Sequence, residues 1–424
     1  MLRMPLGQVK PGMVLATPVA NPKQLEYDLL KAGFELTGSM IERLRELGVR
    51  TVWISYPDLD FLDQVISPKV THQQQEVYQS LKQGFGNSQK HVVARVDFQE
   101  YRRTLSGLIE AIASQHADTL LSDPLMSESG DLMLHCSNVC YLALMMGIKL
   151  GHYLVQQRMR LDPRHARDVM NLGLGALMHD IGKIQLPTEL RGGSPAAGDA
   201  AVATWQSHAA KGFEAVRGKL EPSASQVVLH HHQRWDGAGF PVVESYGKPL
   251  AGDRIHVFTR IVTMADQYER QLSLANAQGL PAVVAMKTLR GRKYQGLFDP
   301  VVFKTFSDLV PPFPIGSIVG LSDGGQAVVL IHNSDNPCRP TVRRLPDHGK
   351  VAVPGSTSFE GEDVQLAGRA DLSIVMSEGI DTEPFLFTPD EGVSLNEAAS
   401  RTLSLAEPEP GQPAGTVAGA SSAS

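Results

Sequence analysis

The fold is decided by two stretches, LGLGALMHDIGK (residues 172–183) and HHHQRWDGAGFP (residues 230–241). The first begins as an apolar helical run that ends at His179 and Asp180. Gly182 then breaks the helix, so both polar side chains can converge on a cavity at its end. A His-Asp pair by itself is common at helix ends and on surfaces, so its neighbours along the chain decide its meaning.

Helical spacing places further histidines and carboxylates on inward faces. His231 follows Val227 and Val228 at spacings of four and three, so it lies on or beside the inward-facing stripe of its helix. Asp131 and His135 are four residues apart, so on a helix they share one face and can point at one metal ion. No one of these features is specific, but their combination in this order is.

Together these positions form a candidate set of metal ligands. The set is Asp131, His135, His179, Asp180, His208, His231, His232 and Asp266. Imidazole mixed with carboxylate suits Fe, Mn, Zn, Ni or Co, whereas Mg and Ca prefer oxygen ligands. Five histidines and three aspartates exceed the ligands of one zinc ion, so two or three ions bridged by a carboxylate fit better. A site with two ions is suited to phosphoester hydrolysis, because it generates hydroxide at neutral pH and neutralises phosphate charge.

On either side of these candidate ligands, the composition and the spacing of apolar residues divide the chain into several predicted parts. Apolar residues recur every three or four positions through the middle of the chain, which predicts a helical bundle. The glycines of Asp323-Gly324-Gly325 predict a turn between two short β-rich runs. The predicted parts are a small α+β unit (1–65), a linker with a helical lead-in (66–96), the helical domain (97–310), a β-rich extension (311–353) and a disordered tail (405–424).

Bulk properties exclude several classes of protein. The 424 residues carry a formal net charge of -6, so no basic footprint for a nucleic-acid polymer is present. Three cysteines argue against a disulfide framework and favour a reducing compartment. The N-terminus lacks a signal-peptide core, and the longest apolar run, Val139–Ile148, is shorter than the about 20 residues of a membrane span. We therefore expect a cytoplasmic protein without a membrane partner.

Residues 129–310 resemble an HD-GYP domain, a branch of the HD phosphohydrolases. His179-Asp180-x-Gly182-Lys183 matches the HD signature. The residues from His231 to Pro241 match the second signature, with Phe240 where the family has Tyr. The N-terminal unit resembles the small domain that often precedes HD-GYP, and residues 314–342 resemble the β-rich C-terminal extension of the family. The resemblance implies a mostly α fold, an HD-type helical bundle with a small α+β domain before it.

The resemblance also implies an activity, namely hydrolysis of cyclic di-GMP to linear pGpG, to GMP or to both. It assigns the eight candidate ligands to two or three ions, most often iron or manganese, with Asp180 as the bridge. Asp131 falls where trinuclear members have a Glu ligand. Lys183 is expected to contact the scissile phosphate, which makes Asp180 and Lys183 the catalytic candidates. The substrate-binding candidates are Lys183, Arg234, Asp236, Gly239, Phe240 and Pro241.

The sequence departs from the family in two further places. Gln233 replaces the usual Glu after the His-His pair, and the arginine-containing segment that normally follows the late aspartate is replaced by Glu269-Arg270-Gln271-Leu272. Arg290, Arg292 and Lys293 lie further along as candidate substitutes. Three hypotheses follow: a cyclic di-GMP phosphodiesterase, a degenerate module that binds a cyclic dinucleotide or a partner protein with little turnover, and a hydrolase of another phosphoester. Diguanylate cyclases and a second copy of the chain are the expected protein partners.

Overall fold

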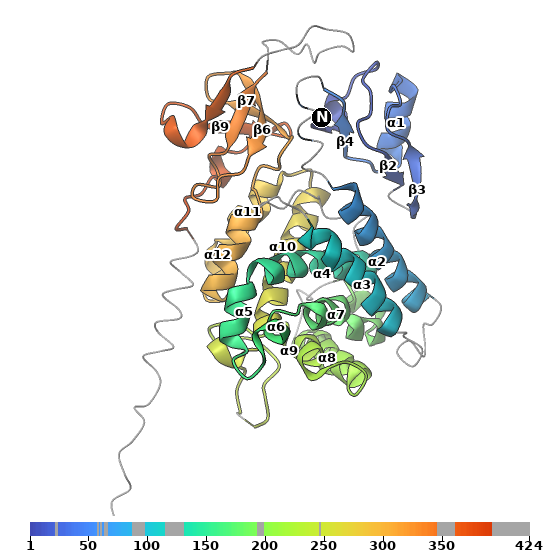
Figure 1. Ribbon diagram of the computed structural model, residues 1–424, viewed down its shortest axis with the longest axis vertical. Coiled ribbons are helices and arrows are strands. Elements are labelled where there is room, and N and C mark those ends of the chain that lie inside the picture. The colour runs from blue at the N-terminus through green and yellow to red at the C-terminus, as the bar shows by residue number, and fades with distance from the viewer. Residues whose placement is uncertain are drawn as a thin grey trace, which may run out of the picture.

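A computed structural model describes most of the chain. The described residues are 1–21, 24–56, 59, 62, 67–86, 98–114, 131–192, 199–245, 247–345 and 361–391. Helices form the body of the molecule, and an N-terminal unit and a C-terminal sheet lie together at one end of it (Figure 1). The predicted mostly α fold is therefore confirmed, whereas the tail predicted to be disordered lies outside the described residues.

The described residues of the N-terminal unit form one α-helix and four short strands. Its strands are β1 (Leu2–Pro5), β2 (Val19–Asn21), β3 (Gln24–Leu30) and β4 (Thr51–Ile54), and β1 pairs with β4 while β2 pairs with β3. The helix, α1 (Gly38–Glu46), begins where the Thr37 side chain accepts a hydrogen bond from Met40 N, and ends before Gly48, whose φ is +83°. A helix together with short strands agrees with the α+β character predicted for this unit. Val14 and Leu15 form only isolated bridges, to Glu35 and Ile54.

The helical body is built around one apolar helix, α4. Its helices are α2 (Pro68–Gly86), α3 (Phe98–Ala113), α4 (Leu132–Lys149), α5 (Gly151–Gln157), α6 (Pro163–Ala166), α7 (Met170–Met178), α8 (Asp199–Val216), α9 (Pro222–His230), α10 (Val257–Ala277), α11 (Ala282–Leu289) and α12 (Pro300–Leu309). α4 packs against α7, α10 and α2. By length and composition α4 could cross a membrane, but 72% of it is buried inside the fold. A helix apolar on all sides and enclosed by other helices is a core helix.

The segment predicted as a linker with a helical lead-in (66–96) contains a full helix of the bundle, and its residues 87–96 lie outside the described residues. Residues 68–86 form α2, which packs against α3 and α4 and belongs to the bundle. Its buried side chains Val70, Val77 and Leu81 follow at spacings of seven and four, which places them on one helical face. The abundant glutamines between them hid this stripe in the sequence.

The C-terminal extension is a six-stranded antiparallel sheet. Its strands lie in the order β10-β9-β5-β6-β7-β8, with β5 at Ile318–Leu321, β6 at Gln326–Ile331, β7 at Thr341–Arg344, β8 at Asp363–Gln365, β9 at Ile374–Ser377 and β10 at Ile380–Asp381. The predicted hairpin is β5–β6, with Gly324 at φ +87° in its turn. The predicted end at residue 353 is too early, because β8 and β9 complete the sheet by pairing with β7 and β5.

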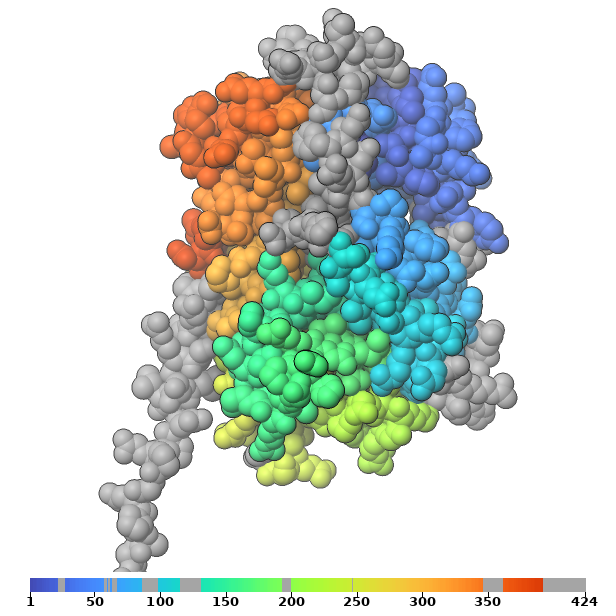
Figure 2. Space-filling view, viewed as in Figure 1, coloured from blue at the N-terminus to red at the C-terminus, as the bar shows by residue number. Residues whose placement is uncertain are grey.

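The N-terminal unit docks on this sheet. Arg3 N donates to Gly316 O (2.9 Å), and the Arg3 guanidinium pairs with Glu378 (2.5 Å). Gly316 has φ +82°, and a Cβ there would lie 2.6 Å from the Trp53 ring, so glycine permits this close approach. In Figure 2 both units lie beyond the helices at the same end of the molecule. The two ends of the described chain therefore form one structural cap on the bundle.

Asp299 at the start of α12 forms a buried ion pair with Arg260, and this pair predicts that Asp299→Ala destabilises the fold. Asp299 caps α12 through Val301 N (2.8 Å) and accepts from Arg260 (2.6 Å) and the Tyr153 hydroxyl (2.7 Å). The substitution leaves the Arg260 guanidinium buried without its main partner, so we expect a loss of about 3–5 kcal/mol in unfolding free energy. Denaturant unfolding measures it.

The matched control for this prediction is Asp253→Ala. Asp253 lies 3.4 Å from the same Arg260, but its side chain is 75% exposed. An exposed pair contributes about 0–1 kcal/mol. Equal losses in the two variants would contradict a special role for the buried pair.

Candidate metal centre

The packing of one glycine brings the first ligands together. His179 ends α7, Asp180 follows it, and the short 3-10 helix η4 (Ile181–Gln185) carries the chain onward. A Cβ on Gly182 would lie 1.9 Å from His208 O and 2.6 Å from Gly212 N. Only glycine therefore lets η4 lie directly against α8, which carries His208 toward Asp180.

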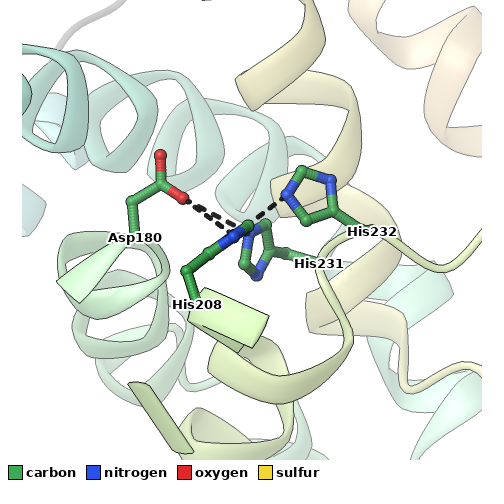
Figure 3. A group of neighbouring side chains, drawn as sticks. All are labelled: Asp180, His208, His231 and His232. Atoms are coloured by element: carbon green, nitrogen blue, oxygen red, sulfur yellow. Dashed lines mark hydrogen bonds and ion pairs between the residues drawn. The ribbon is translucent and has the colours of Figure 1, made fainter. Parts of the chain in front are cut away.

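The first metal-ligand cluster consists of Asp180, His208, His231 and His232, whose ligand atoms lie within 4.8 Å of one another. Asp180 Oδ1 is 3.4 Å from His208 Nε2 and 3.5 Å from His231 Nε2, and Figure 3 shows the three imidazoles gathered beside this carboxylate. His208 Nε2 is also 3.2 Å from His232 Nε2. Three helical segments distant in sequence thus supply one donor set.

The second metal-ligand cluster consists of His135, His179, Asp180 and Asp266. Asp180 Oδ2 lies 3.5 Å from His135 Nε2 and 3.4 Å from His179 Nε2. Asp266 Oδ1 lies 3.0 Å and 3.5 Å from the same two nitrogens. The two oxygens of Asp180 therefore face different clusters, which is the geometry of a bridging carboxylate.

Backbone carbonyls orient the imidazoles of both clusters. The Nδ1 atoms of His179, His208 and His231 lie 2.7, 2.6 and 3.0 Å from the carbonyls of Ala176, Trp205 and Val228. A carbonyl accepts only, so each Nδ1 carries the proton and each Nε2 is left with its lone pair toward the cluster. This tautomer is the one that binds a metal through Nε2.

Burial and charge hold the donors of the first cluster in their metal-binding forms. Burial lowers the pKa of His208 to about 3 and also lowers the pKa of His231 and His232. Burial alone would raise the pKa of Asp180, but the cations around it, Lys183 first, hold that pKa well below its usual range. His179 Nε2 and Asp180 Oδ1 are buried without a hydrogen-bond partner among the described residues. In the first cluster, neutral imidazoles, an ionised carboxylate and an unsatisfied buried oxygen fit a divalent metal ion. In the second cluster, although burial lowers the pKa of His179, Asp180 raises it well above its usual range, so a metal ion there must displace a proton.

Asp131 does not join either cluster, contrary to the sequence-based prediction. It precedes α4 as its N-cap, and its Oδ1 accepts hydrogen bonds from Met133 N (2.9 Å) and Leu134 N (3.2 Å). Its Oδ2 accepts from the Tyr78 hydroxyl (2.6 Å). The prediction assumed that Asp131 lies within the helix of His135. A residue at the N-cap turns its side chain back onto the first helical turn instead.

Asp131→Ala tests this correction. We expect the variant to retain the metal content of the wild type and to lose about 1 kcal/mol of unfolding free energy, because only a helix cap is removed. Elemental analysis and denaturant unfolding measure the two quantities. Asp131→Asn, which keeps a capping oxygen, is the matched control and should recover most of the stability. Loss of a metal ion from Asp131→Ala would restore it as a ligand.

Two residues of the centre were missed as site residues by the sequence analysis. The Glu269 carboxylate contacts His135 Nδ1, and although burial lowers the pKa of His135, Glu269 raises it to about 10. Arg270 donates to Asp180 Oδ2 through Nη2 (2.8 Å) and to Asp266 Oδ1 through Nε (2.8 Å). Both follow Asp266 by three and four residues on α10. That helical spacing was the available signal for their position at the site.

Lys183, the predicted catalytic cation, lies beside Asp180. Its Nζ is 2.6 Å from Asp180 Oδ2, and its side chain is 1% exposed. The same Nζ lies 5.9 Å from the centre of the Trp205 ring. Trp205 also contacts the rings of His208 and His232, so an aromatic wall borders the cation and the first cluster.

The remaining predicted substrate-binding residues form a loop after His232. Arg234 and Asp236 pair with each other at 2.7 Å, and Arg234 also donates to Gln295 O. Phe240 stacks on the His232 ring with centroids 4.5 Å apart. A Cβ on Gly239 would lie 2.5 Å from His232 O, so this glycine allows the loop to fold back. Gln233 ties the loop together by donating to Pro241 O (2.6 Å) and accepting from Leu250 N (2.9 Å).

Arg290 does not substitute for the missing arginine segment. It is buried beside Phe387, with the guanidinium carbon 3.9 Å from the ring centre, and it donates to Ser307. Its role is to join α11 and α12 to the C-terminal segment. Arg270 is instead the arginine that the structure places at the metal centre.

Known proteins with similar sequences match the part of the chain that contains the two clusters. The HD domain family matches residues 133–271, which include the ligands of both clusters. A cyclic di-GMP phosphodiesterase of Pseudomonas aeruginosa is 30% identical over 268 residues, 62% of this chain and 59% of that protein. The chain thus spans about three fifths of that relative's length.

Two further relatives match shorter segments. A cyclic di-GMP phosphodiesterase response regulator of Xanthomonas campestris is 29% identical over 31% of this chain and 34% of its own length. A 3'3'-cGAMP-specific phosphodiesterase of Vibrio cholerae is 31% identical over 22% of this chain and 17% of its own length. The HD match, both signatures and the two clusters that share the HD aspartate make this chain similar to proteins of the HD-GYP family.

Proposed function

We propose that this protein is a metal-dependent phosphodiesterase that hydrolyses cyclic di-GMP to linear pGpG, to GMP or to both. The observation that carries the proposal is the position of Asp180, whose two oxygens face two different His/Asp clusters. Two divalent ions held at such positions would supply hydroxide at neutral pH and neutralise charge on the attacked phosphate. The similarity to a cyclic di-GMP phosphodiesterase of Pseudomonas aeruginosa supports the choice of substrate.

The charges of the site support an anionic substrate. The chain as a whole has a formal net charge of -6, yet Lys183 and Arg270 both lie within 2.8 Å of Asp180. Metal ions would add further positive charge at the same place. A phosphodiester is therefore attracted to the centre by local charge and needs no basic surface.

We infer that the ions are iron or manganese and that two positions exist, one in each cluster. The N-cap role of Asp131 leaves a third position without its expected carboxylate. Lys183 is proposed to contact the scissile phosphate as a point charge. Phe240 and Trp205, which flank His232, are proposed to border the nucleotide. We place the protein in the cytoplasm, with diguanylate cyclases and a second copy of the chain as its proposed partners.

A signalling module with little turnover is the second candidate. The observation that favours it is Arg270, which pairs with carboxylates of both Asp180 and Asp266. A guanidinium on these ligands would weaken metal binding while leaving a positive pocket for a cyclic dinucleotide. The Vibrio relative adds 3'3'-cGAMP to the substrates that a test must include.

The deciding experiment is incubation of the full chain with cyclic di-GMP or 3'3'-cGAMP after anaerobic loading with Fe²⁺ or Mn²⁺. Chromatography resolves pGpG and GMP, and calorimetry measures binding in parallel. We expect hydrolysis of cyclic di-GMP by metal-loaded protein and none after chelation. Tight binding without product would support the signalling module, and faster hydrolysis of 3'3'-cGAMP would change the assigned substrate.

A further inference from the structure

Arg270 donates hydrogen bonds to carboxylate oxygens that also belong to the second metal-ligand cluster. Asp180 Oδ2 and Asp266 Oδ1 face the two histidines of that cluster, and both accept hydrogen bonds from the Arg270 guanidinium at 2.8 Å. We propose that Arg270 acts as a built-in cation in the second cluster, so that a metal ion binds there only when this side chain moves out. The inference rests on the metal centre of the proposed function.

The contacts of Arg270 are confined to one side of the centre. It reaches Oδ2 of Asp180, whereas the histidines of the first cluster lie near Oδ1. The first cluster therefore combines one carboxylate with three imidazoles and has no guanidinium among them. The two positions should consequently differ in their affinity for a divalent ion, with the first cluster the stronger.

The charge balance leads to the same conclusion. Around the second cluster the carboxylates are Asp180, Asp266 and Glu269, and the fixed cations are Lys183 and Arg270. With His135 and His179 neutral, as metal binding requires, a divalent ion added to this buried group would bring the positive charge to four against three negative charges. Like charges a few ångströms apart are costly where water is excluded. Departure of Arg270 returns the balance to three against three.

The surroundings allow Arg270 to leave. Its side chain is 22% exposed, whereas Asp180 and Asp266 are fully buried. The side-chain hydrogen bonds described for Arg270 go to those two aspartates alone. A long side chain held at its tip can therefore turn toward solvent while α10 and the aspartates stay in place. Occupation of the second cluster by a metal ion becomes an exchange of one cation for another.

The test is a Mn²⁺ titration of metal-free full-length protein, followed by equilibrium dialysis with elemental analysis. Wild type should bind one ion tightly and a second ion at least about tenfold more weakly, as expected for a competing charge at the same oxygens. Arg270→Ala should strengthen binding of the second ion by about tenfold or more and leave the first unchanged. Electron paramagnetic resonance should show coupling between the two ions at lower Mn²⁺ in Arg270→Ala than in wild type.

The control and a second variant keep the test decisive. Arg217→Ala removes an arginine that directly follows α8, is 65% exposed and pairs with Glu214, and it should behave as wild type. Arg270→Gln tests the loss of charge at nearly constant size if the alanine variant folds poorly. Two ions of equal affinity in wild type would overturn the inference, and so would a second constant that neither variant changes. Failure of every protein to bind any ion would remove the proposed function along with it.

Discussion

Asp180→Ala should remove metal from the protein and reduce hydrolysis of cyclic di-GMP at least about a thousandfold. The reason is geometric, because one carboxylate supplies a donor to each cluster through different oxygens. Its loss also leaves Lys183 and Arg270 without the carboxylate oxygen that both contact, so their positive charge opposes an approaching ion. A bridging carboxylate holds two ions at the spacing that activates water and polarises phosphate together. Elemental analysis and product chromatography measure both effects.

The matched control for this prediction is Asp168→Ala. Asp168 is an exposed aspartate whose Oδ1 accepts a hydrogen bond from Met170 N at the start of α7. This variant should keep the metal content and hydrolysis of the wild type. Hydrolysis by Asp180→Ala at the wild-type rate would refute the assigned site. A folded Asp180→Ala protein that keeps both ions would refute the bridging role even if activity fell.

Lys183→Ala should behave in the opposite way with respect to metal. We expect metal content to be retained and turnover to fall about a hundred- to a thousandfold, which is typical for removal of one charge-stabilising group. Lys183 Nζ lies 2.6 Å from Asp180 Oδ2 in a buried position. Its removal takes away a positive charge that partly neutralises the carboxylate. The metal ions therefore lose no ligand and are attracted more strongly to Asp180. The substrate phosphate, by contrast, loses a cation that would bind it.

The comparison for Lys183 is Lys183→Arg, together with Lys219→Ala as a surface control. Arg keeps the charge but not the compact ammonium geometry, so it should recover part of the turnover. Lys219 lies exposed after α8, and its substitution should change neither metal content nor turnover. Loss of both ions from a folded Lys183→Ala protein would show that the lysine supports the metal site rather than the substrate.

Most of the candidate ligands could be predicted because their positions depend on short spacings along the sequence. The His179-Asp180 pair at the end of an apolar helix, the glycine after it and the histidines beside Val227 and Val228 are all described by short spacings. The structure brings seven of the eight predicted ligands into its two clusters. Asp131 failed because helical spacing was extended one residue too far, past the point where α4 begins.

The fold prediction failed for strands whose partner strands lie far away in the sequence. It also failed for a helix whose apolar residues are separated by many polar ones. The residues of α2 were read as part of a linker with a helical lead-in, because glutamines separate the buried residues. The burial of those residues depends on contact with α3 and α4. β8 and β9 were missed because each is short and is stabilised by strands that lie elsewhere in the sequence. The periodicity and composition of one segment do not indicate which distant helices or strands will pack against it.

By itself the sequence determined the helical bundle, the chemical identity of the ligands and their order along the chain, because helical period and the His-Asp signature depend on neighbouring residues. Only the tertiary structure decided that the two oxygens of Asp180 face different clusters. It also decided that Arg270, 90 residues from Asp180, donates to the same carboxylate. The physical reason is that the packing of α7 and η4 against α8, α9 and α10 sets these distances. No local spacing records how those helices approach one another.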